Sequence, residues 1–213
     1  MFQNICLTCN NSKFNEQRFL QTDGTAQGPH MSCSYADIAM AKYDSLANEF
    51  HLKPKIWKRF RDDILISWEH GLNTLPSFLE HLNSMGKTGK ITFTMEIADE
   101  NGLEFLDLKL KIVESKIRVD VYAKPTNSFS YTSPNTCYPN KNICNIPKGI
   151  ALRLRRICDD NETFDKRSLE YQNYLIARDH KPSTVKHHFS EVRNKTRPEA
   201  RLKQNRKEMV SGI

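Results

Sequence analysis

Apolar residues along the chain follow two periods, one typical of strands and one typical of helices. Branched and aromatic runs predict strands, expected at residues 56–61, 64–68, 91–97, 103–113 and 117–123, with a small hairpin at 13–19. Apolar residues at helical spacing predict helices, expected at residues 32–50, 72–85, 146–158 and 165–178, with a further helix after Pro182. A strand, a helix and then a meander of strands predict an α+β layer in the first part of the chain.

The character of the sequence changes at Lys124, where a polar stretch with several prolines begins. We interpret this stretch as the boundary between a domain of residues 1–124 and a small helical domain of residues 125–192. Three short helices with a basic surface favour a helix-turn-helix arrangement, and a plain bundle with solvated arginines is the alternative. Residues 193–213 are polar and basic, which predicts a disordered tail.

Asp62 and Asp63 lie between the strands expected at 56–61 and 64–68, so we expect them to form the tight turn of a hairpin. Side chains alternate faces along a strand, so one carboxylate can point forward while its neighbour holds the loop. A carboxylate on a rigid hairpin tip suits Mg²⁺, which prefers oxygen ligands. Asp is also an ordinary turn residue, and by itself this stretch is explained more simply that way.

The net charge of +7 and the pI near 9.1 come mostly from the C-terminal part of the 213-residue chain. Residues 181–213 contain nine Lys or Arg and three Glu. A basic segment of this kind indicates a polyanion partner, most often nucleic acid. A solvated tail and a nuclear targeting signal remain alternatives, because charge by itself does not distinguish them.

The six cysteines have no secretory signal before them, which indicates a reducing, intracellular compartment, nuclear or cytoplasmic, rather than secretion. No apolar run approaches the length of a membrane span, so we expect no membrane partner. Cys6 and Cys9 form a C-x-x-C, but the chain supplies no second pair at zinc-finger spacing. Ordinary thiols are therefore the favoured interpretation.

A polar loop with Gly24 and Gly28 precedes the helix expected at 32–50. A glycine-rich loop that opens a helix can bind phosphate at the helix N-terminus. The Walker spacing is absent, so a plain loop is the simpler interpretation of these residues alone.

Taken in order, these segments resemble the reverse transcriptases of the Penelope-like retroelement group. The segments that carry the resemblance are Gln21 with 24–28, the Phe-Arg-Asp-Asp box at 60–63, the Leu-Glu-Phe-Leu-Asp-Leu strand at 103–108, and the helical region 122–178. The resemblance implies a partial polymerase palm, an antiparallel sheet with packed helices, followed by a small all-α thumb of helix-turn-helix type. It also implies an RNA template and a DNA primer as partners, and an N-terminal half of the polymerase that the chain lacks.

The resemblance assigns roles to particular residues. Asp62 is the expected direct ligand of catalytic Mg²⁺, and Asp63 is a weaker ligand or support. The loop residues Gln21, Gly24, Gln27 and Gly28 would line the nucleotide and template, and the strand residues Phe105, Leu106 and Asp107 would form the primer-grip region. The residues expected to bind nucleic acid in the helical domain are Lys148, Arg153, Arg155 and Arg156.

The motifs depart from the family pattern at several positions. Phe60 replaces a tyrosine, Arg61 replaces a small or apolar residue, and Gln27 stands before the glycine where the family usually has methionine. In the family a second essential aspartate lies on a strand upstream of the glycine loop, and the fingers precede it. We therefore expect an incomplete Mg²⁺ site and no polymerase activity from the chain alone. A non-catalytic helix-turn-helix module that binds nucleic acid is the alternative.

Overall fold

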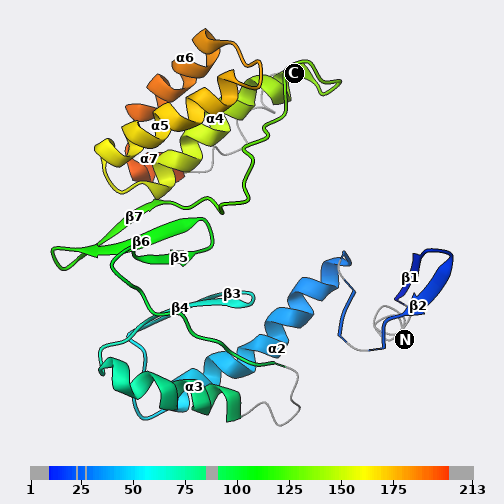
Figure 1. The fold of residues 1–213 in the computed structure, drawn as a ribbon, viewed down its shortest axis with the longest axis vertical. Helices are drawn as coiled ribbons and strands as arrows, with labels where there is room; N and C mark the ends of the chain where they lie inside the picture. Colours follow the sequence, from blue (N-terminus) through cyan, green and yellow to red (C-terminus); the bar gives the residue numbers. More distant parts are fainter. Residues whose placement is uncertain (1–9, 23, 27, 85–90, 202–213) are drawn as a thin grey trace, which may run out of the picture. The chain divides into compact units, whose positions relative to one another are not determined.

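The structure is a computed structural model that describes residues 10–22, 24–26, 28–84 and 91–201. The chain divides into two compact units, one ending at Met95 and the other beginning at Glu96 (Figure 1). The fold is α+β with small antiparallel sheets, as the hydrophobic pattern predicts. None of the described helices combines the length and the apolar character that a membrane span needs.

The described residues of the first unit form two hairpins, two α-helices and a short 3₁₀ turn. Its elements are β1 (Asn11–Phe14), β2 (Gln17–Leu20), α2 (His30–Glu49), β3 (Ile56–Phe60), β4 (Asp63–Ser67), a 3₁₀ turn η1 (Leu72–Thr74) and α3 (Leu75–Ser84). Among the described strands, β1 pairs with β2 alone and β3 pairs with β4 alone. Each hairpin is antiparallel and closed by a two-residue turn.

The core of the first unit forms where α2, α3 and the β3–β4 hairpin meet. Its buried residues in α2 are Tyr43, Leu46 and Ala47, and Phe50 is the C-cap of that helix. Helix α3 contributes Phe78 and Leu82. From the hairpin, Trp57 and Ile66 pack against this cluster, and the centre of the Trp68 ring lies 4.8 Å from that of Phe78. The two-stranded hairpin therefore gains its stability from apolar packing against helices, since an isolated hairpin is marginal in water.

The second unit combines a three-stranded antiparallel sheet with a helical bundle. Its strands are β5 (Leu103–Phe105), β6 (Leu108–Val113) and β7 (Lys116–Val121), in the spatial order β5-β6-β7. Its helices are α4 (Asn140–Ile157), α5 (Asn161–Ile176), α6 (Pro182–Arg193) and α7 (Arg197–Arg201). Asp160 caps α5, because its side chain accepts a hydrogen bond from the Thr163 amide.

The sheet and the helices of the second unit share one core. Val121 of β7 is buried in the same cluster as Leu154 of α4, Leu175 of α5 and Val185 of α6. The division between compact units therefore falls after Met95, whereas the sequence predicts a boundary after Lys124. The proline-bearing stretch that suggested that boundary is a connection inside the unit, with Phe129 stacked on Tyr174.

Several elements differ from the sequence prediction. Residues 91–97 form no strand, and the run 103–113 is interrupted by a turn at Leu106 and Asp107. Helix α4 begins six residues earlier than expected, because buried Ile143 adds a turn of apolar contact. Pro147 lies inside the helix. The predicted disorder beyond Arg193 is wrong for residues 197–201, where α7 buries Ala200.

Candidate functional site

The Asp62 and Asp63 side chains lie at the tip of the β3–β4 hairpin. Phe60 pairs with Asp63, so Arg61 and Asp62 form the two-residue turn and Asp63 is the first residue of β4. This corrects the prediction that Asp62 and Asp63 together form the turn. Strand pairing sets the register of a hairpin, and it places Arg61 in the left-handed region, with a φ of 57°.

Both aspartates are exposed, and neither carboxylate forms a hydrogen bond or ion pair within the described ranges. No group of three metal-ligating side chains in the described part of the chain includes Asp62 or Asp63. The tip therefore presents two adjacent carboxylates whose oxygens have no partner among the described residues, and carboxylate oxygens are ligands that a hard cation prefers.

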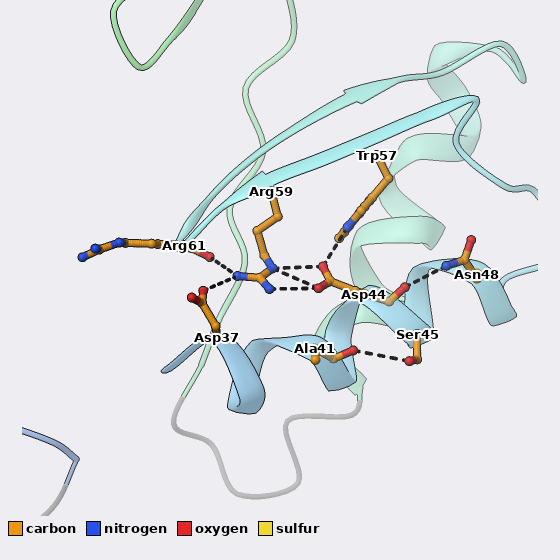
Figure 2. A network of polar contacts seen from close by, with 8 residues as sticks. All are labelled: Asp37, Ala41, Asp44, Ser45, Asn48, Trp57, Arg59 and Arg61. Carbon is orange, nitrogen blue, oxygen red and sulfur yellow. Dashed lines mark hydrogen bonds and ion pairs between the residues drawn. The ribbon is translucent and has the colours of Figure 1, made fainter. Parts of the chain in front are cut away.

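Arg59 fixes this tip to helix α2 (Figure 2). Its Nε donates to Asp44 Oδ1 at 3.0 Å, and its Nη2 donates to Asp44 Oδ2 at 2.9 Å. Its Nη1 reaches Asp37 Oδ1 at 3.3 Å and the carbonyl oxygen of Arg61 at 3.1 Å. One guanidinium thus joins two carboxylates of α2 to the backbone of the turn that carries Asp62.

The spacing of these residues in the sequence places them on the facing sides of β3 and α2. Trp57 and Arg59 are two residues apart in β3 and so lie on the same face, which points at α2. Asp37 and Asp44 are seven residues apart, two helical turns, and therefore lie on one face of α2. Trp57 Nε1 also donates to Asp44 Oδ1, at 2.9 Å. Arg59 and Asp44 are not among the residues selected from the sequence, although the seven-residue spacing of the two acids was a usable signal.

The ion pair between Arg59 and Asp44 shifts the pKa of both groups. Arg59 is well covered, with 13% of its side chain exposed. Its hydrogen bonds hold the pKa of the Asp44 carboxyl below the ordinary value, and burial opposes this shift only in part. The Asp44 hydrogen bond in turn raises the pKa of Arg59. Both groups are therefore ionised at neutral pH, and the bond between them is charge-assisted.

The glycine loop before α2 has the backbone that glycine permits. Gly24 has a φ of 75° and Gly28 a φ of 124°, conformations that other residues adopt only with strain. The backbone N–H of Gln21 donates to the backbone carbonyl of Asn10 at 2.9 Å, which connects the start of the loop to the first hairpin. Gln27 lies outside the described residues. The predicted contact of this loop with nucleotide or template stays a prediction.

The predicted primer-grip residues lie at another two-residue turn, between β5 and β6. Phe105 pairs with Leu108, so Leu106 and Asp107 lie in the turn, and Leu106 has a φ of 56°. The Asp107 carboxylate accepts a hydrogen bond from Arg153 Nε at 3.0 Å, and its carbonyl accepts one from the Tyr122 amide at 2.9 Å. A cavity of about 310 Å³ lies beside this turn, and its lining includes Leu106, Asp107 and Tyr122. Asp107 therefore connects the turn to α4.

The four basic residues selected in the helical region all have partners inside the second unit. Lys148 pairs with Glu191 at 2.9 Å, and Arg153 pairs with Asp107. Arg155 Nε donates to the carbonyl of Lys195 at 2.8 Å, while its guanidinium lies over the Phe164 ring. Arg156 donates to the carbonyl of Ala200. These cations bind groups of the same unit, which leaves fewer of their donors for a phosphate backbone.

Comparisons with protein-family models, with curated proteins and with solved structures found no match to the chain. What the chain does is therefore inferred from the hairpin and its surroundings.

Proposed function

We propose that the chain is part of an RNA-directed DNA polymerase, a reverse transcriptase of the Penelope-like type, in which Asp62 and Asp63 bind catalytic Mg²⁺. The observation that supports this most is the Arg59 network. It fixes the backbone of the turn at Arg61 while both neighbouring carboxylates remain exposed and unpaired. A turn that served only to connect two strands would not need a partly covered guanidinium to hold it.

Nucleotide addition uses Mg²⁺ to activate the primer 3′-hydroxyl and to stabilise the leaving pyrophosphate. In this scheme Asp62 is a direct ligand and Asp63 is a second ligand or support. Arg59 acts as a positioning residue, because its guanidinium bonds to Asp37, Asp44 and the Arg61 carbonyl and, among the described contacts, not to Asp62 or Asp63. The remaining ligands would come from nucleotide phosphates, water and a further carboxylate.

The test is binding of the full chain to a primer–template duplex, with and without Mg²⁺, for the native chain and for Asp62→Asn. We expect Mg²⁺ to tighten binding of the native chain and to have little effect on Asp62→Asn. Glu114→Gln is the matched control, because Glu114 is an exposed carboxylate in another hairpin turn. If the affinity for the duplex changes neither with Mg²⁺ nor with Asp62→Asn, the proposed metal site is wrong.

The second candidate function is a non-catalytic nucleic-acid-binding module in the second unit. Lys111 and Lys116 at the exposed β6–β7 hairpin favour it, because within the described residues neither forms an ion pair. If they bind phosphates, replacing both with alanine lowers the salt slope of binding, by about one unit for each phosphate that is no longer neutralised. An unchanged slope would exclude this hairpin as the binding surface.

A further inference from the structure

Three potential metal ligands meet on helix α6, far along the chain from the aspartate hairpin. They are His187, His188 and Glu191, whose ligating atoms all lie within 4.8 Å of one another. Glu191 follows His187 by four residues and His188 by three, spacings that place side chains on one side of a helix. Two imidazoles and a carboxylate are a ligand set that zinc accepts in proteins.

The His188 ring supplies the second observation. Its Nδ1 atom is buried and has no hydrogen-bond partner among the described residues, although 19% of the side chain as a whole is exposed. A buried polar atom without a partner requires an explanation, and a bound ion is one. Nδ1 lies 3.6 Å from Glu191 Oε2, which is too long for a hydrogen bond. It is close to the separation of about 3.4 Å between two ligands of a tetrahedral zinc ion.

The two oxygens of Glu191 have different surroundings. Oε1 accepts a hydrogen bond from Lys148 at 2.9 Å and lies 4.0 Å from Lys195 Nζ, while Oε2 faces His188. The contact with Lys148 holds Oε1 and leaves Oε2 on the side of the histidine. One oxygen is thus held by α4 and the other is directed at the imidazole.

We propose that His187, His188 and Glu191 bind one Zn²⁺ ion, with water at the fourth position. His187 is exposed on the same helix, and its ring centre lies 5.5 Å from that of His188, so a rotation of its side chain completes the set. The nitrogen ligands exclude Mg²⁺ as the preferred ion, since Mg²⁺ selects oxygen ligands. This site is separate from the aspartate hairpin in both residues and metal.

The test is a calorimetric titration of the full chain with Zn²⁺, compared with His187→Ala and His188→Ala. We expect each substitution to weaken one binding site at least about tenfold. His30→Ala is the matched control, because His30 is an exposed histidine on another helix, and its zinc affinity should equal that of the native chain. His187→Ala keeps the test valid if replacement of the less exposed His188 disturbs folding. Native affinity in both variants would overturn the proposal.

A cobalt titration separates this site from one built on cysteine. Co²⁺ bound by imidazole and carboxylate gives visible bands without the intense near-ultraviolet band of a cobalt–thiolate bond. We expect visible bands that disappear in His187→Ala. A thiolate band that persists in both histidine variants would assign the metal to cysteines and overturn the proposal.

Lys195→Met gives a result of opposite sign. Lys195 Nζ lies 4.0 Å from Glu191 Oε1, so its charge opposes a cation bound to that carboxylate. Removing the charge is expected to tighten zinc binding by about two- to fivefold, since Lys195 is partly exposed and its charge is screened. Weaker zinc binding in Lys195→Met would contradict the placement of the ion on Glu191.

Discussion

Arg59 on β3 and Asp44 on α2 are joined by a bidentate ion pair, with N–O distances of 2.9 to 3.1 Å. The same guanidinium reaches the carbonyl of Arg61 in the turn beside Asp62. One side chain therefore connects the packing of α2 to the conformation of the exposed carboxylates. If the proposed metal site is correct, changes at Asp44 reach the metal through Arg59.

Replacing Arg59 with lysine keeps the charge and removes the fork of donors that binds both Asp44 oxygens and the Arg61 carbonyl. We expect Arg59→Lys to lower the free energy of unfolding by about 1–2 kcal/mol, the scale of charge-assisted hydrogen bonds at a partly covered site. Urea unfolding measures this. Amide hydrogen exchange of residues 60–63 should also become faster. Lys58→Ala, on the opposite face of the same strand, is the control and should change little.

Asp44 also predicts a pH dependence of stability. Its folded pKa lies below the ordinary value of 3.8, mainly because of the Arg59 hydrogen bonds. The unfolded chain therefore binds this proton more readily, and the stabilisation is complete above about pH 5 and is lost as the pH falls through the folded pKa.

The stability difference between the native chain and Asp44→Asn should therefore shrink as the pH falls from 6 to about 2.5. Urea unfolding at several pH values gives this difference directly. A difference that stays constant, or that grows toward low pH, would contradict the assignment to the Asp44 carboxylate.

Val121 tests the division of the chain into units. It is buried on β7 among residues of α4, α5 and α6. We expect Val121→Ala to cost about 1–3 kcal/mol and to accelerate amide exchange in α4, because the cavity opens in a core shared with the helices. Ile112→Ala on β6 is the control, since that side chain is 72% exposed and should contribute little. Faster exchange confined to the strands would mean that sheet and helices are energetically separate.

Two glycines of the second unit give opposite predictions for the same substitution. Gly102 has a φ of 97°, and an added Cβ would overlap the carbonyl of Leu110, so Gly102→Ala should destabilise by about 2 kcal/mol or more. Gly149 lies within α4 with open space around it, so Gly149→Ala should stabilise by about 0.5–1 kcal/mol. Thermal unfolding of the two variants measures both signs. A Gly102→Ala variant as stable as the native chain would contradict the argument from the positive φ and the overlap with Leu110.

The sequence alone determined the elements whose causes are local. The β3–β4 hairpin and helices α3, α5 and α6 follow from hydrophobic period and breaking residues, which act within a few positions. The α+β class follows from their order. The exposure of Asp62 and Asp63 agrees with the hairpin tip that the sequence predicts, although the turn residues differ by one position.

The tertiary structure decided what depends on residues far apart in the chain. Arg153 and Asp107 are 46 residues apart, and Lys148 and Glu191 are 43 apart, so no local pattern shows that these charges bind each other. For the same reason the sequence could not show that β7 shares a core with α4, or that Arg59 binds Asp44. The type of a residue, charged or apolar, limits the kind of partner that it can bind. Which of the many suitable partners it binds depends on the tertiary structure.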